Sequence, residues 1–217
     1  MRAKKMPFKN LWEKELAGDM GASEASELIN RFQNKYRELC DNHPEIPHAA
    51  LKKHLHGNIF PQMAAYTIFL EDNTSETALM RIQKLHMLTL INQRKSYEMF
   101  CMLPFSFRLL RIICSFRTKF TFPSTGWKIE WLENNNDFIS LKIHSCFYYE
   151  IMKEYGMPKL ISIYCDGDNY VFKDIKSRYI GWGRTKTLSG GSDYCDSIHY
   201  NKARKLKLVE PNADRIN

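Results

Sequence analysis

Residues 120–143, FTFPSTGWKIEWLENNNDFISLKI, mark the point where the chain changes from helical to extended patterning. Pro123 and Gly126 interrupt any helix that enters this stretch. Two segments rich in aromatic and β-branched residues, 127–132 and 138–143, flank the polar residues 133–137. This arrangement predicts a β-hairpin with a five-residue loop.

The chain before the hairpin has helical patterning. Apolar residues recur at helical spacing over about 23–41, which predicts an amphipathic helix there. Gly57 is expected to end the next helix, Pro61 to lie in the first turn of the one after it, and Asn73 with Glu76 to form an N-cap arrangement. Further helices are expected over about 48–56, 62–71, 74–102 and 105–116.

The chain after the hairpin mixes helices and strands. A helix over 147–155 is expected to close at Gly156, and Pro158 to open a short helix leading into Tyr164 and Cys165. Strands are expected over 178–188 and 194–200. The predicted fold class is α+β, with a helical region of residues 1–120 packed against an α+β region of residues 121–217. That second region holds an antiparallel sheet and one or two helices, and the sequence leaves open whether the two regions form one continuous domain.

Composition favours a folded, cytoplasmic protein. The chain has 217 residues, of which 44% are apolar, enough for a substantial core. The most apolar stretch, 100–116, is broken by Pro104, Arg108 and Arg111, and the basic start lacks the apolar run of a signal peptide. We therefore expect free thiols and no membrane partner. A membrane-surface role for 105–116 is weighed here, but a core-packing helix with solvent-facing arginines is favoured.

The net charge of +8 is spread over both halves of the chain. Its one dense cluster, residues 202–207, is interpreted as a solvated tail. A nucleic-acid partner is therefore not expected. The sequence does not specify an oligomeric state.

The residues that carry chemistry lie within 32 positions. Cys165-Asp166-Gly167-Asp168 is followed by Arg184 and then by Gly190-Gly191 and Cys195-Asp196. Two thiols that each adjoin a carboxylate are suited to nucleophilic or metal-binding chemistry, which requires the thiolate form.

The order of these residues resembles a known family. The pattern reads His144-x-Cys146-x-Tyr148, Gly156-x-Pro158-x-Leu160, Cys165-x-x-Asp168 and Arg184-x-x-Thr187-x-x-Gly190-Gly191-x-x-Tyr194-Cys195-Asp196. It is similar to the L-2-amino-thiazoline-4-carboxylic acid hydrolase family. The family usually continues with an aromatic residue and an arginine after the last motif, whereas this chain has Ser197, Ile198 and His199, which leaves the substrate open.

The resemblance implies hydrolytic opening of a small cyclic isothiourea acid, giving N-carbamoyl-L-cysteine. Cys165 is the candidate nucleophile, activated by a base such as His144. Asp168, with Asp166 as its deputy, suits the amidinium of the substrate, and Arg184 suits the carboxylate. Tyr148, Thr187, Cys195 and Asp196 complete the predicted substrate-binding set. No cofactor is expected.

Each residue also has a structural interpretation. Residues 166–169 form a good turn sequence, and Gly190-Gly191 suits a chain reversal. His144 and Cys146 suit a hydrogen-bonded core histidine beside a buried thiol. Arg184 suits a pair with Asp193 or Asp196 across a hairpin.

Two alternatives concern the whole site. His144, Cys146, Cys165 and Cys195 could together hold a zinc ion, although they lack the paired C-x-x-C knuckles of strong zinc motifs. A small-molecule binding or sensor module of the same fold would retain the pocket without turnover. The enzyme requires Cys165 as a thiolate with a depressed pKa, and the binding module does not.

Overall fold

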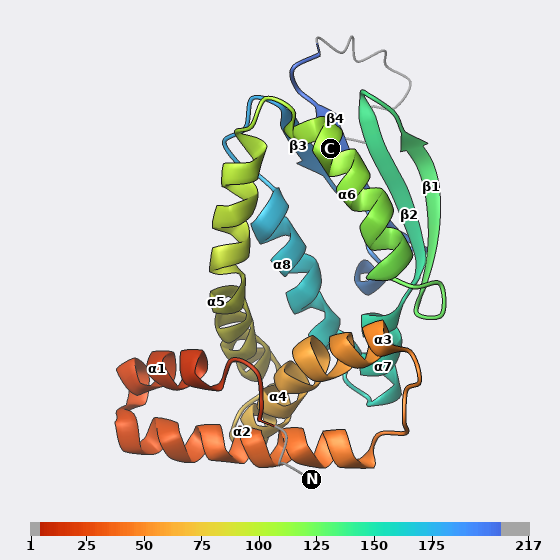
Figure 1. Cartoon of the computed structure of the whole chain (residues 1–217). Coiled ribbons are helices and arrows are strands. Elements are labelled where there is room, and N and C mark those ends of the chain that lie inside the picture. The colour runs from red at the N-terminus through yellow and green to blue at the C-terminus, as the bar shows by residue number, and fades with distance from the viewer. Residues whose placement is uncertain (1–4, 205–217) are drawn as a thin grey trace.

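The computed structural model describes residues 5–204, which form a helical body and a four-stranded antiparallel sheet (Figure 1). The strand order is β1-β2-β4-β3. All helices up to residue 120 precede the sheet, and the later helices lie between its strands along the chain. The predicted α+β class, with an antiparallel sheet in the C-terminal half, is confirmed.

Seven helical elements make up the first half of the described chain. The helices over 23–41, 62–71, 74–102 and 105–116 are confirmed, with Pro61 in the first turn of its helix. The elements are α1 (Lys9–Met20), α2 (Ala22–Asn42), α3 (Ala49–His54), the π-helical turn η1 (Leu55–Ile59), α4 (Phe60–Asp72), α5 (Ser75–Cys101) and α6 (Ser106–Phe120).

Two predicted helix boundaries were wrong. Gly57 does not end a helix, because the chain continues from α3 through η1 into α4 without leaving helical backbone. Thr74, not Asn73, caps α5, since its hydroxyl accepts a hydrogen bond from the Thr77 amide at 3.3 Å. The Asn73 side chain is engaged elsewhere, donating to the Phe69 carbonyl at 2.8 Å.

The second half begins with the predicted hairpin, which is confirmed. Its loop is shorter than the five residues expected, because β1 continues to Asn134 and only residues 135–137 connect the strands. The strand expected over 178–188 is shorter, because residues 184–194 leave the sheet and fold back on β4. Residues 166–169 form part of a helix rather than a turn. The elements are β1 (Trp127–Asn134), β2 (Phe138–Cys146), α7 (Phe147–Glu154), the 3-10 turn η2 (Pro158–Ile161), α8 (Ser162–Phe172), β3 (Ile180–Gly183), the 3-10 turn η3 (Leu188–Gly190) and β4 (Cys195–Asn201).

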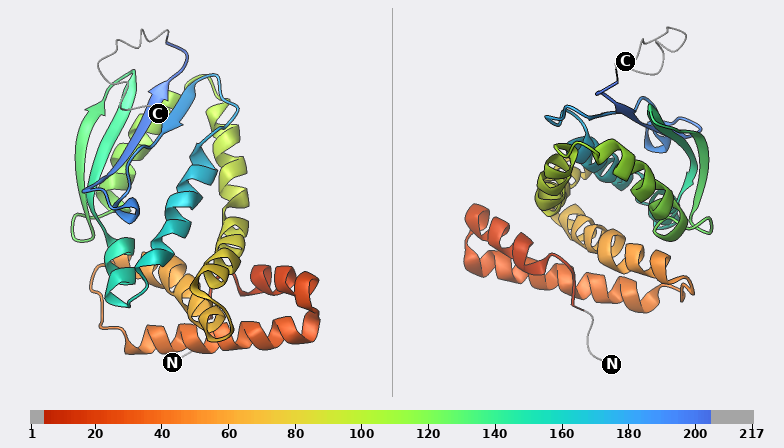
Figure 2. Two further views of the ribbon diagram at one scale, coloured as in Figure 1. Left: turned by 180° about the vertical axis from the view of Figure 1, so that it is seen from behind. Right: turned by 45° about the horizontal axis from the view of Figure 1, so that its top comes forward.

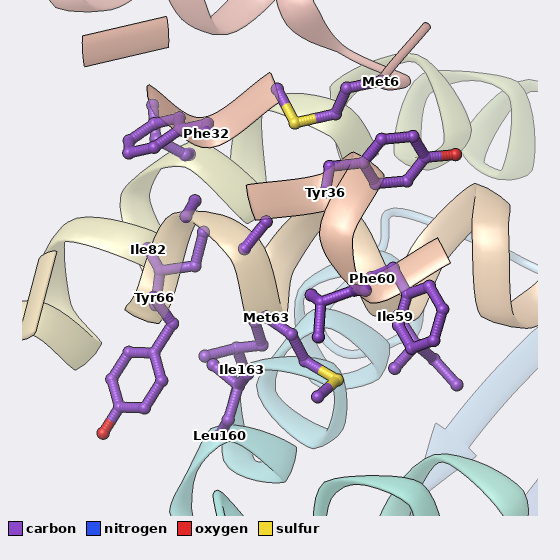
Figure 3. Packing of buried hydrophobic residues seen from close by; sticks show 14 of the residues in the cluster. Met6, Phe32, Tyr36, Ile59, Phe60, Met63, Tyr66, Ile82, Leu160 and Ile163 are labelled. Carbon is purple, nitrogen blue, oxygen red and sulfur yellow. The ribbon is translucent and has the colours of Figure 1, made fainter. Parts of the chain in front are cut away.

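The main core joins both halves of the chain (Figure 3). Apolar side chains of α2, α4 and α5 meet those of η2 and the start of α8. This packing fixes the N-terminal end of α8 against the helical body, which removes apolar area from water. The side chains labelled in Figure 3 are Met6, Phe32, Tyr36, Ile59, Phe60, Met63, Tyr66, Ile82, Leu160 and Ile163.

A smaller core lies under the sheet. Phe107 and Leu110 of α6 pack with Ile139 of β2 and Ile180 of β3. The core-packing role expected for this helix is therefore present, although it involves only one of its faces. None of the helices within residues 5–204 has the length and apolarity needed to cross a membrane.

A substitution in β3 tests the packing of the sheet. Gly181 lies under the ring of Tyr200, and a Cβ there would stand 2.0 Å from the Tyr200 Cζ atom. We expect Gly181→Ala to lower the free energy of unfolding by about 1–3 kcal/mol, because the ring must move, as measured by urea denaturation. Gly183→Ala is the matched control, since a Cβ at that position meets nothing within 4 Å. Equal effects of the two substitutions would contradict the packing.

Candidate active site

Helix α8 supplies a thiol and a carboxylate on one face. It lies between α5 and the sheet (Figure 2). Cys165 and Asp168 are three residues apart, so they share the face directed at the segment between β3 and β4. Asp166 lies on a different side and accepts a hydrogen bond from Gln83 of α5 at 3.0 Å. The structure therefore places Asp168, and not Asp166, on the same helix face as Cys165.

Gly167 explains why a turn-like sequence is helical here. A Cβ at this position would lie 2.8 Å from Leu90 and 3.0 Å from His86, both of α5. The absence of a side chain lets α8 approach α5 closely. The glycine thus serves helix packing, and the flanking residues keep their positions on the helix.

Arg184 connects α8 to the segment that follows β3. Its guanidinium donates to the Asp168 carboxylate at 2.8 Å, and its Nε donates to the Asp196 carbonyl at 3.2 Å. The Arg184 side chain is only 10% exposed, whereas that of Asp168 is 49% exposed. The guanidinium also lies 5.3 Å from the centre of the Trp182 ring. The alternative prediction, that Arg184 pairs with the carboxylate of Asp193 or Asp196, was wrong, because the carboxylate partner of Arg184 is Asp168.

Asp196 holds the backbone of this segment. Its carboxylate accepts hydrogen bonds from the amides of Thr185 and Lys186 at 2.8 and 2.7 Å, and from the Thr185 hydroxyl at 2.6 Å. The side chain is buried. Three hydrogen bonds to one buried carboxylate fix the position of the neighbouring Arg184.

A chain of hydrogen bonds leads from Cys165 into the η3 turn. The Cys165 Sγ lies 3.3 Å from the Ser189 hydroxyl, which donates to the Thr187 hydroxyl oxygen at 3.1 Å. The same Thr187 oxygen accepts from the Gly190 amide. The Cys195 Sγ accepts a hydrogen bond from the Leu188 amide at 3.1 Å. Thr187 and Cys195 therefore support the turn that faces Cys165.

Burial raises the pKa of three thiols of the predicted set, and the charge of Arg184 acts on two of them, Cys165 and Cys195. Burial raises the pKa of Cys165, and the hydrogen bond to Ser189 and the charge of Arg184 only partly oppose this. Burial likewise raises the pKa of Cys195, and it raises that of Cys146 to about 11. Cys165 is consequently a protonated thiol near neutral pH in this structure. The depressed pKa expected for an enzyme is not present.

His144 is not brought to Cys165. Its Nε2 lies 2.7 Å from the Glu130 carboxylate on β1, and its ring lies 6.0 Å from the Tyr194 ring. The reason is the strand register, which places Glu130 opposite Lys142 and thus diagonally next to His144. The hydrogen-bonding nitrogen of His144 is engaged by Glu130, so this geometry does not support activation of Cys165 by His144. His144 is a hydrogen-bonded histidine, but it is partly exposed rather than in the core.

Tyr148, in the first turn of α7, is bound to His54. Its hydroxyl lies 2.8 Å from His54 Nδ1, while His54 Nε2 lies 2.8 Å from the Thr121 carbonyl. Since a carbonyl only accepts, Nε2 carries the proton and Tyr148 donates to Nδ1. Burial lowers the pKa of His54 and raises that of Tyr148, so both are neutral. The Tyr148 ring packs against the rings of Trp127 and Tyr164, and its hydroxyl is directed at His54.

Sequence reasoning missed several residues that the structure adds. Ser189 contacts Cys165, Trp182 lies beside Arg184, and His54 orients Tyr148. His199 is buried, with no hydrogen-bond partner for its Nε2 in the described part of the chain. Burial and the charge of Arg184 lower the pKa of His199 to about 3. Two of these residues had a signal in the sequence: Ser189, next to the Gly190-Gly191 pair, and His199, where the chain departs from the family's pattern.

The proposed zinc ligands do not gather. Among residues 5–204, no three His, Cys, Asp or Glu side chains are placed to share a metal ion. The Nε2 atom of His144 is instead engaged by the Glu130 carboxylate at 2.7 Å. The four residues weighed as zinc ligands therefore do not form a ligand set in this structure.

A family comparison covers this whole arrangement. A model of the L-2-amino-thiazoline-4-carboxylic acid hydrolase family matches residues 12–199. The chain belongs to this family. The match includes the helical body as well as the candidate site, and the family's name implies a hydrolase. Neither a curated protein nor a solved structure gave a match.

The environment of Cys165 predicts how its reactivity depends on Arg184. Because the guanidinium lowers the pKa of the thiol, we expect Arg184→Gln to shift the pH midpoint of Cys165 alkylation upward. At a fixed pH below that midpoint, alkylation by iodoacetamide should slow by about threefold or more, because one pKa unit changes the thiolate fraction about tenfold. Peptide mass spectrometry separates Cys165 from the other thiols.

Arg178→Gln controls for the loss of one positive charge, since Arg178 is exposed. An unchanged alkylation profile in Arg184→Gln would contradict the electrostatic coupling.

Proposed function

We propose that this protein hydrolyses a small zwitterionic cyclic amidine of the L-2-amino-thiazoline-4-carboxylate type to N-carbamoyl-L-cysteine. The observation that carries the proposal is the ion pair of Arg184 and Asp168 beside Cys165. A zwitterion with a carboxylate and an amidinium is the charge complement of that pair. Family membership supports the same reaction class.

Each of the two charged residues binds one charged group of the substrate. Arg184 binds the carboxylate through its planar guanidinium, which is already held by the Asp196 carbonyl and the Trp182 ring. Asp168 accepts two hydrogen bonds from the amidinium nitrogens, which orients the ring and increases the electrophilicity of its carbon. The half-exposed Asp168 side chain is free to turn from Arg184 to the substrate.

Cys165 is the nucleophile in this proposal. Its sulfur adds to the amidine carbon, the bond from that carbon to the ring sulfur breaks, and the thiol proton ends on the departing ring sulfur. The product of this half is an isothiourea linked to Cys165. Water then adds to the same carbon, the bond to Cys165 breaks, and the urea of N-carbamoyl-L-cysteine remains. One water is consumed, and Cys165 regains its proton.

The substrate itself provides the activation that Cys165 lacks in this structure. Burial raises the pKa of the thiol, so an adjacent positive charge has a large effect on it. An amidinium held by Asp168 lies one helical turn from Cys165 and favours the thiolate. This removes the need for His144 as a base.

The remaining residues position these groups. Asp196 fixes the backbone next to Arg184, and Thr187 fixes Ser189 against Cys165. Tyr148 is bound to His54, so its predicted contact with substrate has no direct support in the hydrogen bonds of the site. Asp166 has no contact with substrate in this proposal, because it is bound to Gln83.

One observation favours a binding module instead. The raised pKa of Cys165 keeps the thiol protonated, as a module that only binds a ligand would allow. Such a module would bind the same zwitterion through Arg184 and Asp168 and release it unchanged.

Turnover separates the two functions. We expect the purified protein to convert L-2-amino-thiazoline-4-carboxylate to a product heavier by one water, detected by mass spectrometry. Cys165→Ser should reduce the rate by about 10³-fold or more, because a hydroxyl is a much weaker nucleophile than a thiolate. Asp168→Asn should reduce it by about 10²-fold, since the charged acceptor for the amidinium is lost.

Cys114→Ser is the matched control, because this thiol lies on α6 in the smaller core. Binding of the substrate without conversion, measured by calorimetry, would contradict the hydrolase and favour the binding module. Unchanged turnover in both site variants would show that the site lies elsewhere.

A further inference from the structure

Helix α6 and the residues that precede it carry a concentrated set of exposed apolar side chains. Of the fourteen large hydrophobic side chains exposed in residues 5–204, nine lie between positions 99 and 120. Scattered exposed hydrophobics are normal, but such a concentration marks an interaction surface. The nine are Met99, Met102, Leu103, Phe105, Leu109, Ile112, Ile113, Phe116 and Phe120.

Most of these side chains form one stripe along α6. Successive residues turn by about 100° around a helix, so positions 105, 109, 112, 116 and 120 fall on one side. Phe107 and Leu110 fall on the opposite side and are buried against the sheet. Figure 1 shows α6 lying at the front of the molecule with no other helix in front of it. We call this outward stripe the apolar face of α6.

Positive charges border this face, and negative charges are absent from it. Residues 99–129 contain no Asp or Glu, but they contain five Arg or Lys. By helical geometry, Arg108 and Lys119 border the apolar face on one side and Arg117 borders it on the other. None of these three forms an ion pair with any carboxylate in residues 5–204.

We infer that the apolar face of α6 docks on an anionic membrane surface, with the helix axis parallel to the bilayer plane. A helix of this kind inserts its apolar side chains at the boundary of headgroups and acyl chains. Flanking Arg and Lys side chains reach the headgroups from both sides, and each contributes attraction to anionic lipid. Phe116, which is 61% exposed, and Ile112, which is 62% exposed, lie at the centre of the contact.

A second copy of the chain fits this face less well. Two such faces brought together would place the bordering arginines and lysines of both copies near one another, with no acidic residue in 99–129 to compensate. An anionic lipid surface has no such repulsion. The charge pattern therefore selects the membrane over self-association.

This inference revises the expectation of no membrane partner. That expectation had two grounds. The first, that no segment spans a membrane, holds for the described residues. The second was the assumption that α6 buries its apolar residues in the core. Only one face does so. The inference is independent of the proposed hydrolase reaction, because no residue of the candidate site lies on α6.

Cosedimentation with vesicles tests the inference. We expect the full chain to bind vesicles of equal parts phosphatidylglycerol and phosphatidylcholine, to bind pure phosphatidylcholine at least about tenfold more weakly, and to lose binding as salt rises. The double variant Ile112→Gln with Phe116→Gln should bind the anionic vesicles at least about tenfold more weakly, since two apolar side chains that insert into the bilayer are lost. Arg108→Gln with Lys119→Gln should weaken only the binding to anionic vesicles.

Met80→Gln is the matched control, because Met80 is 65% exposed but lies near the start of α5, outside the apolar face of α6. Circular dichroism verifies that the variants remain folded. Absence of vesicle binding, or equal binding by the Ile112/Phe116 variant and the parent, would overturn the inference. So would a dimer in analytical ultracentrifugation that the same variant converts to monomer, because the occupant would then be a second copy.

Discussion

The ion pair between Arg184 and Asp168 is the interaction on which the candidate site depends. A guanidinium that is only 10% exposed requires a partner, since an unpaired buried charge is costly. The partner belongs to α8, while the arginine belongs to the connection between β3 and β4. The pair therefore joins the helical body to the sheet and, in doing so, brings the connection to Cys165.

Both sides of this pair are positioned by packing elsewhere. On the helical side, Leu160 and Ile163 anchor the start of α8 in the main core, and Gly167 lets the helix lie close to α5. On the sheet side, the buried Asp196 carboxylate fixes the backbone that follows Arg184. The long helices at the N-terminus thus contribute to the site without supplying residues to it, which agrees with a family match that begins at residue 12.

The sequence predicted the fold class well because its signals are local. The hairpin around residues 133–137 and the amphipathic spacing of α2 need only neighbouring residues to be read. The helix end predicted at Gly57 was wrong because a π-helical turn keeps this glycine in helical backbone. Asp166 to Asn169 look like a turn by composition, and the close approach of α5 that makes Gly167 a helix residue is not visible in sequence.

The site was predictable in content but not in geometry. Family order identified Cys165, Asp168, Arg184 and Cys195, and the structure gathers them. The hydrogen-bond partners of the predicted residues depend on tertiary contacts, which the sequence does not show. Glu130 binds His144, Gln83 binds Asp166, and Ser189 contacts Cys165. The exposed apolar face of α6 could not be predicted from the sequence either. A helix with two apolar faces has the same periodicity whether one face or both are buried.

Arg184 and Asp168 are proposed to recognise a zwitterion together, beside Cys165. A crystal structure of the protein with N-carbamoyl-L-cysteine tests this recognition. We expect the carboxylate of the product on the Arg184 guanidinium, its ureido nitrogens on the Asp168 carboxylate, and the ureido carbon facing Cys165. A product bound with neither group on these residues, while Arg184 and Asp168 remain paired to each other, would show that the pair does not recognise the ligand.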